Sequence, residues 1–128
     1  MLLAIALAGC EGEAPRWEGA YLGQLSRSAR FRVEGELHVR GGGADGAELR
    51  IARDGERYRL ELPGCTALAD AEGARLHVDP RTQCACEATE ASAEATVAGR
   101  VTRDEGRVRV ELTGTTEEGT CDWRFVQR

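Results

Sequence analysis

Five cysteines carry the most specific chemistry in this sequence of 128 residues. A thiol can be acylated, oxidised to a disulfide or bound to a metal, and its spacing and compartment decide which. Setting the first cysteine aside leaves an even set, which predicts two disulfides in an oxidising compartment: Cys65, Cys84, Cys86 and Cys121. Four thiolates around zinc are the alternative, but the paired C-x2-C spacing of such sites is missing.

The two central cysteines are separated by one residue, so a bridge between Cys84 and Cys86 would close a very small, strained ring. Such a bridge would also constrain little of the unfolded chain. We therefore expect Cys65 to pair with one of them and Cys121 with the other. The sequence leaves open which partner each takes.

The other reactive side chains form no catalytic or metal-binding pattern. His38 and His77, the two histidines, fall on the charged phase of predicted strands, which favours surface positions. His77 and Asp79 share a face, but no third ligand lies nearby, so we expect no metal and no cofactor. No serine lies in a G-x-S-x-G motif, and the carboxylates alternate with arginines as on a solvated sheet. We expect a protein that is not an enzyme.

The first ten residues have the pattern of a targeting segment. Residues 2–8 are an apolar run (LLAIALA), which is too short to span a bilayer but typical of a cleavable signal. Residues 7–10, Leu-Ala-Gly-Cys, resemble the lipobox of bacterial lipoproteins. The resemblance implies a signal peptide at residues 1–9, a lipid on Cys10, a short tether at residues 10–16, and anchoring in the bacterial cell envelope, at the outer membrane. The alternative is a buried first strand or helix with Cys10 in the core.

Composition narrows the class of the remaining chain. Charged residues make up 30% and hydrophobic residues 41% of the sequence, as in an ordinary globular domain. Residues 17–128 fit a single domain. The 17 arginines are interleaved among 22 acidic residues, and the net charge is −5. Without a concentrated basic surface, we expect no nucleic-acid partner.

Alternation of apolar and polar residues with period two predicts strands along the chain. Residues 31–40 alternate throughout and predict one strand with a buried face. The pair Asp54-Gly55 predicts a tight hairpin turn. A second hairpin is expected between residues 97–101 and 108–112. We expect the three glycines at residues 41–43 (Gly41-Gly42-Gly43) to form a flexible connection and residues 86–95 to form a loop.

About eight strands joined by short turns predict an all-β fold, an antiparallel up-and-down barrel or sandwich, of which we favour the barrel. The stretch WEGAYLG at residues 17–23, with the meander that follows, resembles bacterial calycin-like and lipocalin-like lipoproteins. The resemblance implies a closed barrel that is either filled or holds one small apolar ligand.

A lipid-anchored, non-catalytic binding domain is therefore the leading functional hypothesis, for a small apolar ligand or for a partner protein. Its candidate binding residues are the aromatic side chains predicted to point inward: Tyr21, Phe31, Tyr58, Trp123 and Phe125. Leu37 and Leu60 share that predicted phase. The alternatives are a protease inhibitor, with residues 11–16 or the loop after Pro80 as its contact, and a structural component of the envelope.

Overall fold

The computed structural model describes residues 16–128, and this part of the chain forms nine β-strands. The strands are β1 (Gly19–Val33), β2 (Glu36–Asp54), β3 (Arg57–Leu62), β4 (Cys65–Glu72), β5 (Arg75–Val78), β6 (Gln83–Ala88), β7 (Ala91–Asp104), β8 (Arg107–Thr116) and β9 (Gly119–Gln127). All of the strand pairs are antiparallel. The fold of these residues is all-β.

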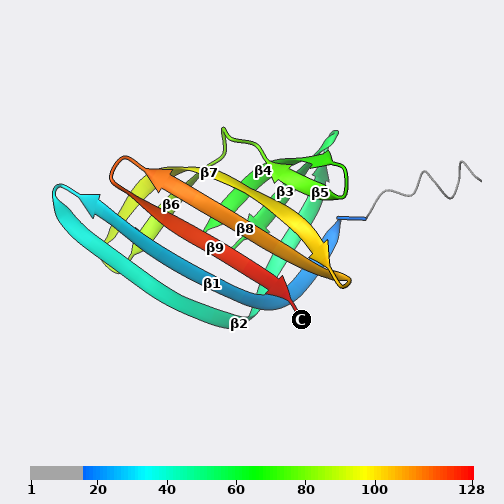
Figure 1. Cartoon of the computed structure of the whole chain (residues 1–128), viewed down its shortest axis with the longest axis horizontal. Coiled ribbons are helices and arrows are strands. Elements are labelled where there is room, and N and C mark those ends of the chain that lie inside the picture. The colour runs from blue at the N-terminus through cyan, green and yellow to red at the C-terminus, as the bar shows by residue number, and fades with distance from the viewer. Residues whose placement is uncertain (1–15) are drawn as a thin grey trace, which may run out of the picture.

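The strands form one sheet that closes on itself. Its order is β5-β4-β3-β2-β1-β9-β8-β7-β6, and an additional pairing of β5 with β7 joins Leu76 to Val101. That pairing closes eight strands into a barrel, and β6 adds to the first half of β7. The predicted antiparallel barrel is confirmed. In Figure 1, β1, β9, β8 and β7 cross in front of β3, β4 and β5.

The barrel has two distinguishable ends (Figure 1). β1 begins and β9 finishes at one of them, which we call the terminal end. The turns between β1 and β2 and between β8 and β9 lie at the other, which we call the hairpin end. Trp17 precedes Gly19, the first residue of β1, by two positions, so the described part of the chain begins at the terminal end.

Side chains fill the interior of the barrel. On β1, Leu25 and Phe31 point inward and are 3% and 0% exposed, whereas Gln24 and Arg30 point outward. The largest fully buried side chains come from almost every strand: Trp17, Trp123, Phe31, Phe125, Leu49, Ile51, Leu60, Leu76, Leu112, Val97, Val101 and Val108. Such packing is typical of a protein core rather than of a binding cavity.

Both predicted hairpins are confirmed. Asp54 pairs with Arg57 across a two-residue turn, where Gly55 adopts a φ of +65°. In the second hairpin, Val101 pairs with Val110, and the turn between β7 and β8 follows Asp104. Glycine or another residue that tolerates positive φ is required at such tight turns.

The prediction of one strand over residues 31–40 is wrong. A two-residue turn at Glu34 and Gly35, whose φ values are +52° and +81°, splits this stretch into the ends of β1 and β2. The turn leaves Leu37 and Val39 on the outer face, where they are 39% and 60% exposed. The alternation continues across the turn, so it conceals the reversal of the chain.

The three glycines at residues 41–43 lie within β2, so the predicted flexible connection is also wrong. They pair with residues 26–28 of β1. Two residues after Gly43 the register shifts, so that Gln24 opposes both Asp45 and Gly46 in a β-bulge. Gly46 adopts a φ of +73°, which glycine tolerates without strain. The bulge bends β2 between its glycine segment and its core-facing half.

Residues 86–95 form strands rather than the predicted loop. β6 ends at Ala88, a two-residue turn follows, and β7 begins at Ala91. Cys86 and Ala95 are buried at 0% and 1% exposure. Alanine and glutamate disfavour strands only weakly, and burial against the rest of the sheet overrides that preference here.

Two disulfides join this part of the chain. Cys65 pairs with Cys84 and Cys86 pairs with Cys121, which resolves the pairing that the sequence leaves open. The first bridge ties β6 to β4, and the second ties it to β9. The predicted pair of disulfides is confirmed, and it indicates an extracytoplasmic protein.

Candidate functional site

The five aromatic residues predicted to bind a ligand are part of the core or pack against it. Phe31, Trp123 and Phe125 are 0%, 2% and 0% exposed, and Tyr58 is 7% exposed. Tyr21 is half-buried, and its hydroxyl donates a hydrogen bond to the carbonyl oxygen of Trp17 at 2.7 Å. None of the five lines any of the surface hollows described below.

One polar atom in this core has no partner among residues 16–128, the indole Nε1 of Trp123. Trp123 pairs with Arg27 of β1, so its indole lies beside the one arginine of β1 that points inward. A buried N–H without an acceptor lowers stability, so the hydrogen bonding of the interior is incomplete at Trp123.

A buried carboxylate, Asp79, organises the connection between β5 and β6. It is 6% exposed and accepts hydrogen bonds from the backbone N–H of Arg81 at 2.8 Å and from its guanidinium at 2.9 and 3.2 Å. The guanidinium of Arg57 donates to the same carboxylate at 2.5 Å and to Asp70 at 2.8 and 3.0 Å. These four residues form the Asp79 cluster.

Hydrogen bonds determine the protonation state of this cluster. The guanidinium of Arg81, followed by that of Arg57, holds the pKa of Asp79 well below its usual range. Arg57 also lowers the pKa of Asp70, and both carboxylates in turn raise the pKa of Arg57. A general acid needs a pKa near the working pH, so an ionised carboxylate with both oxygens occupied fits a structural role. The cluster fixes the chain as it crosses from β5 to β6.

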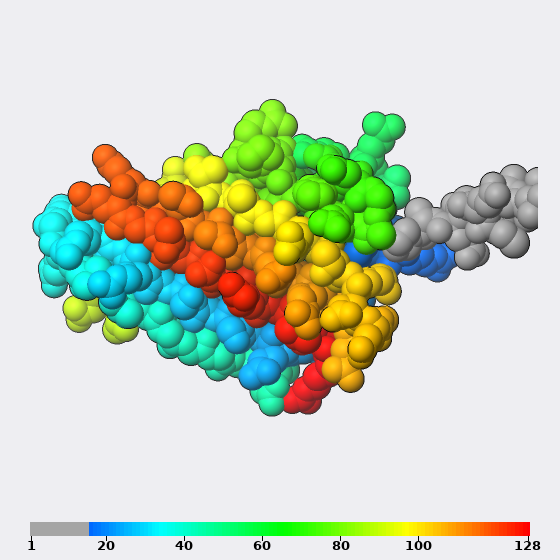
Figure 2. Space-filling view, in the orientation of Figure 1, coloured from blue at the N-terminus to red at the C-terminus, as the bar shows by residue number. Residues whose placement is uncertain are grey.

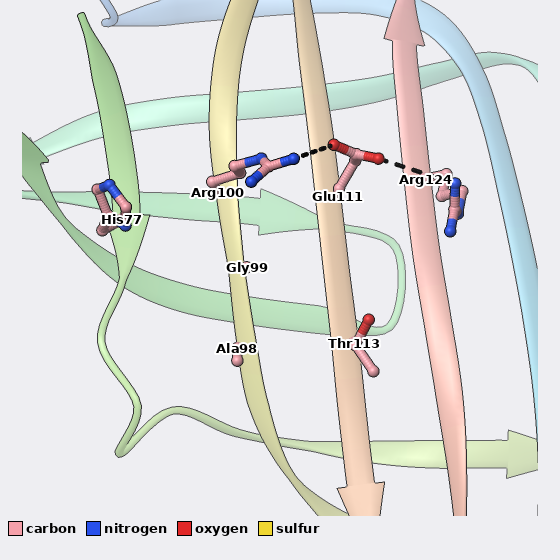
Figure 3. Close-up of a pocket in the computed structure, with 7 residues that line it drawn as sticks. All are labelled: His77, Ala98, Gly99, Arg100, Glu111, Thr113 and Arg124. Atoms are coloured by element: carbon pink, nitrogen blue, oxygen red, sulfur yellow. Dashed lines mark ion pairs between the residues drawn. The ribbon is translucent and has the colours of Figure 1, made fainter.

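A shallow hollow of about 350 Å³ lies on the outer face of β5, β7, β8 and β9 (Figure 3). Glu111 lies between Arg100 and Arg124, with nitrogen-oxygen distances of 3.5 and 3.7 Å. These side chains are between 37% and 65% exposed. Ion pairs with such exposure contribute little stability and are the cross-strand pairs expected of a solvated sheet.

The two histidines lie on different strands, His38 on β2 and His77 on β5. His77 points outward as predicted, and its Nε2 is 3.8 Å from Glu72. His38 does not: its ring lies 5.9 Å from the ring of Phe31, on the inward side of β2, because the turn at Glu34 shifts the phase. No group of three potential metal ligands occurs within residues 16–128.

Another hollow opens at the hairpin end, between the β1–β2 turn, the β8–β9 turn and the beginning of β7. It has a volume of about 540 Å³, and its charged lining is mostly acidic: Arg32, Glu34, Glu94, Glu117 and Glu118. The guanidinium of Arg32 donates to the carbonyl oxygen of Gly35 at 3.2 Å. The arrangement is that of mostly exposed polar residues around an open depression.

The most distinctive hollow lies beside the glycine segment of β2. It has a volume of about 210 Å³ and combines apolar walls with two arginines. We call it the β2 cleft, and its lining is Leu25, Arg27, Arg40, Gly41, Gly42, Gly43, Ala44, Ala47 and Pro63. Gly42 lies directly opposite Arg27, so no side chain of β2 covers that arginine.

Arg27 is held in place from two sides of the β2 cleft. Its guanidinium donates to Glu87 of β6 at 3.0 Å, and its side chain is 19% exposed. A Cβ on Gly64 would lie 2.7 Å from a guanidinium nitrogen of Arg27, so this guanidinium rests against the turn between β3 and β4. Arg40, the other charged residue of the cleft, is half-buried. A positively charged, partly desolvated recess results.

This cleft is not among the predicted sites, although the sequence contains a signal for it. Arg27 occupies the inward phase of β1, between the buried residues Leu25 and Ala29. A charged residue at an inward position is rare unless it is paired. The absence of a side chain at Gly42 could not be connected with Arg27 because the sequence predicts neither the turn nor the register.

Comparison with known protein families, with curated proteins and with solved structures found no match to this chain. Residues 16–128 include no helix long and apolar enough to cross a membrane. The predicted signal peptide, lipobox and Cys10 lie outside the described residues.

Proposed function

We propose that this chain is a non-catalytic, lipid-anchored protein of the bacterial cell envelope whose barrel binds a partner protein at its surface. The filled interior is the observation that carries this proposal. A carrier of small apolar ligands needs a cavity that encloses most of the ligand, commonly of about 300 to 1,000 Å³. Here Phe31, Trp123 and Phe125 occupy that space with 0% to 2% exposure. Recognition is then left to the outer surface.

The position in the envelope is supported by two independent features. The disulfides of the barrel are typical of proteins in an oxidising compartment. The lipobox resemblance at residues 7–10 supplies the anchor, a lipid on Cys10. From Cys10 to Trp17 the chain can reach at most about 25 Å when fully extended, so the terminal end would lie close to the membrane. A calycin-like ancestry fits the closed meander of strands.

A non-catalytic role is supported by the chemistry of the most perturbed groups. Asp79, whose pKa is the most strongly lowered among the carboxylates, has both oxygens engaged by Arg57 and Arg81. His38 and His77 lie on different strands and contact no shared hollow. No nucleophile, base and oxyanion-binding group converge within residues 16–128 in the manner of an active site.

A binding assay with a fluorescent fatty acid tests the filled interior. At micromolar protein, the chain should give no signal that an unlabelled fatty acid displaces, because no cavity is open to it. A lipocalin that binds fatty acids serves as the positive control. A saturable, displaceable signal with a stoichiometry of one would favour a small-ligand carrier and contradict the proposal.

The anchor is tested separately by the substitution Cys10→Ala. In the cells that produce the protein, the unsubstituted chain should begin at a Cys10 that carries acyl chains, as read by mass spectrometry. The variant should carry no acyl mass and should leave the detergent phase. If the variant still partitions into detergent, the anchor does not depend on Cys10 and that part of the proposal is wrong.

A further inference from the structure

We infer that the β2 cleft is the docking site for an extended segment of the partner protein. The segment would add as a strand to the free edge of β2 and place one acidic side chain against Arg27 and Arg40. This inference rests on the proposed function, since the occupant is part of the partner that the barrel binds. Beyond the proposed function, the inference specifies where the partner binds, that it binds as an added strand, and that it contributes an acidic side chain.

The free edge is a property of the strand lengths. β2 is 19 residues long, whereas β3 has 6 residues and pairs only with residues 50–54 of β2. Residues 36–49 pair with β1 on one side and with no other strand of the described chain. β2 runs along the lower border of the molecule in the space-filling view (Figure 2). An unpaired edge offers backbone N–H and C=O groups to an added strand.

The absence of side chains gives an added strand access to the arginines. Gly42 faces Arg27, and the small residue Ala44 faces Leu25. A Cβ built on Gly41 or Gly42 would meet nothing within 4 Å, so the space beside this part of the edge is open. Alternate side chains of an added strand point to one face, and one of them would enter the cleft.

The charge of the cleft favours a carboxylate. Arg27 uses one nitrogen to donate to Glu87, and Arg40 has no ion-pair or hydrogen-bond partner within residues 16–128. A guanidinium carries five N–H donors in a planar fork that matches a carboxylate. The partial burial of Arg27, at 19% exposure, strengthens such a contact relative to one in water.

The size of the cleft favours a side chain of a longer chain over a free ligand. Its volume of about 210 Å³ is below the range usual for small-molecule sites. A glutamate side chain fits such a space, and its apolar stem can lie on Leu25, Ala47 and Pro63. The remaining affinity would come from backbone hydrogen bonds along β2.

A pair of synthetic peptides tests the inference. The first is a seven-residue strand-forming peptide, Thr-Val-Thr-Glu-Thr-Val-Thr, and the second carries Gln in place of Glu. With the full chain bearing Cys10→Ala, the Glu peptide should bind at least about tenfold more tightly than the Gln peptide, by fluorescence polarisation. Backbone amide shifts in NMR spectra of the labelled chain should map its position to residues 40–47.

Variants of β2 make the test specific. Arg40→Gln should reduce binding of the Glu peptide to the level of the Gln peptide. Arg50→Gln, a matched control on the same strand with 58% side-chain exposure and outside the cleft, should change it less than about twofold. Both variants should keep the melting temperature of the parent chain.

Four results would overturn the inference. The first three are equal affinity for the two peptides, no binding up to millimolar peptide, and amide shifts on another face. A dimer that forms with concentration and is lost in Arg40→Gln would assign the cleft to a second copy and also overturn it. None of these results is evidence for a ligand inside the barrel. The fatty-acid assay therefore tests the proposed function independently of the peptide assay.

Discussion

Asp79 is the single residue on which the path of the chain between β5 and β6 most depends. Its backbone N–H donates to the carbonyl oxygen of Leu68 at 2.7 Å, and its carbonyl oxygen accepts from the N–H of Thr82 at 2.9 Å. Its carboxylate accepts hydrogen bonds from the guanidinium groups of Arg57 and Arg81. Because Asp79 connects β3, β4 and the following turn, its replacement should lower the stability of the whole fold.

The substitution Asp79→Asn should lower the melting temperature at neutral pH, since the amide cannot accept three charged donors. The pH dependence identifies the cause. The pKa of Asp79 is lowered in the folded chain, so its contribution to stability is present above the unfolded pKa of about 3.9 and is lost as pH falls towards the lower folded value. The difference in melting temperature between parent and variant should therefore shrink below about pH 4.

Asp45→Asn is the control for that series. Asp45 forms a single exposed ion pair with Arg128 at 2.7 Å, and both side chains are more than 60% exposed. Such pairs contribute little to stability. If Asp45→Asn lowered the melting temperature as much as Asp79→Asn, or if the difference for Asp79→Asn were the same at pH 3 and pH 7, the role given to Asp79 would be wrong.

At the residue scale, the sequence predicts burial well except where a turn is hidden. The inward positions of Phe31, Trp123 and Phe125 follow from alternation alone. Leu37 has the same apparent phase as Phe31 but is exposed, because a tight turn at Glu34 and Gly35 lies between them. Glutamate at a left-handed φ is uncommon, so residue type gives little warning of that turn.

At the scale of elements, β6 is fixed by covalent bonds more than by pairing. As a strand it pairs with β7 alone, and Cys84 and Cys86 join it to β4 and β9. Residues 86–95 are rich in alanine and glutamate, which favour helices, but they have no apolar stripe, so the sequence predicts a loop there. The number of cysteines predicts that two disulfides form, but it does not predict that β6, the segment they attach, is a strand.

Removing the bridges should therefore destabilise the fold in an order set by loop length. The Cys65–Cys84 bridge spans 19 residues and the Cys86–Cys121 bridge spans 35. Loop-closure entropy gives about 3 kcal/mol for the first and about 4 kcal/mol for the second. Urea unfolding of Cys65→Ser/Cys84→Ser and of Cys86→Ser/Cys121→Ser should show losses of this size. A loss below about 1 kcal/mol in either double variant would contradict the importance given to β6.

At the same scale, the β2 cleft arises from a mismatch between neighbouring strands. β2 continues past the end of β3, and its glycine segment leaves Arg27 uncovered. The sequence contains both parts, an arginine in an inward phase and three consecutive glycines, but it places them in different expected elements. Register, which depends on the turn between β1 and β2, brings them together.

At the scale of the whole molecule, the interior of the barrel is filled, so the proposed binding site lies at the edge of β2. Packed side chains occupy the interior, one hollow lies on the outer face, one lies at the hairpin end, and the β2 cleft opens at the free edge of β2 on the side of the inward residues Leu25 and Arg27. The closed antiparallel fold follows from the repeated alternation and short turns, and it was predicted. Whether such a barrel is filled or hollow depends on how eight curved strands pack together, which local patterns do not encode.

Site-specific photo-crosslinking in the cells that make the protein tests the surface-bound partner most directly. A benzophenone amino acid would replace Gly41 at the edge of β2, Ala98 in the outer hollow, or Glu117 at the hairpin end. We predict one protein adduct of defined mass from position 41 and none from position 98 or 117. Adducts from position 98 or 117 alone would show that the partner does not bind at the β2 cleft, and an absence of protein adducts from all three positions would contradict a partner protein bound at the surface of the barrel.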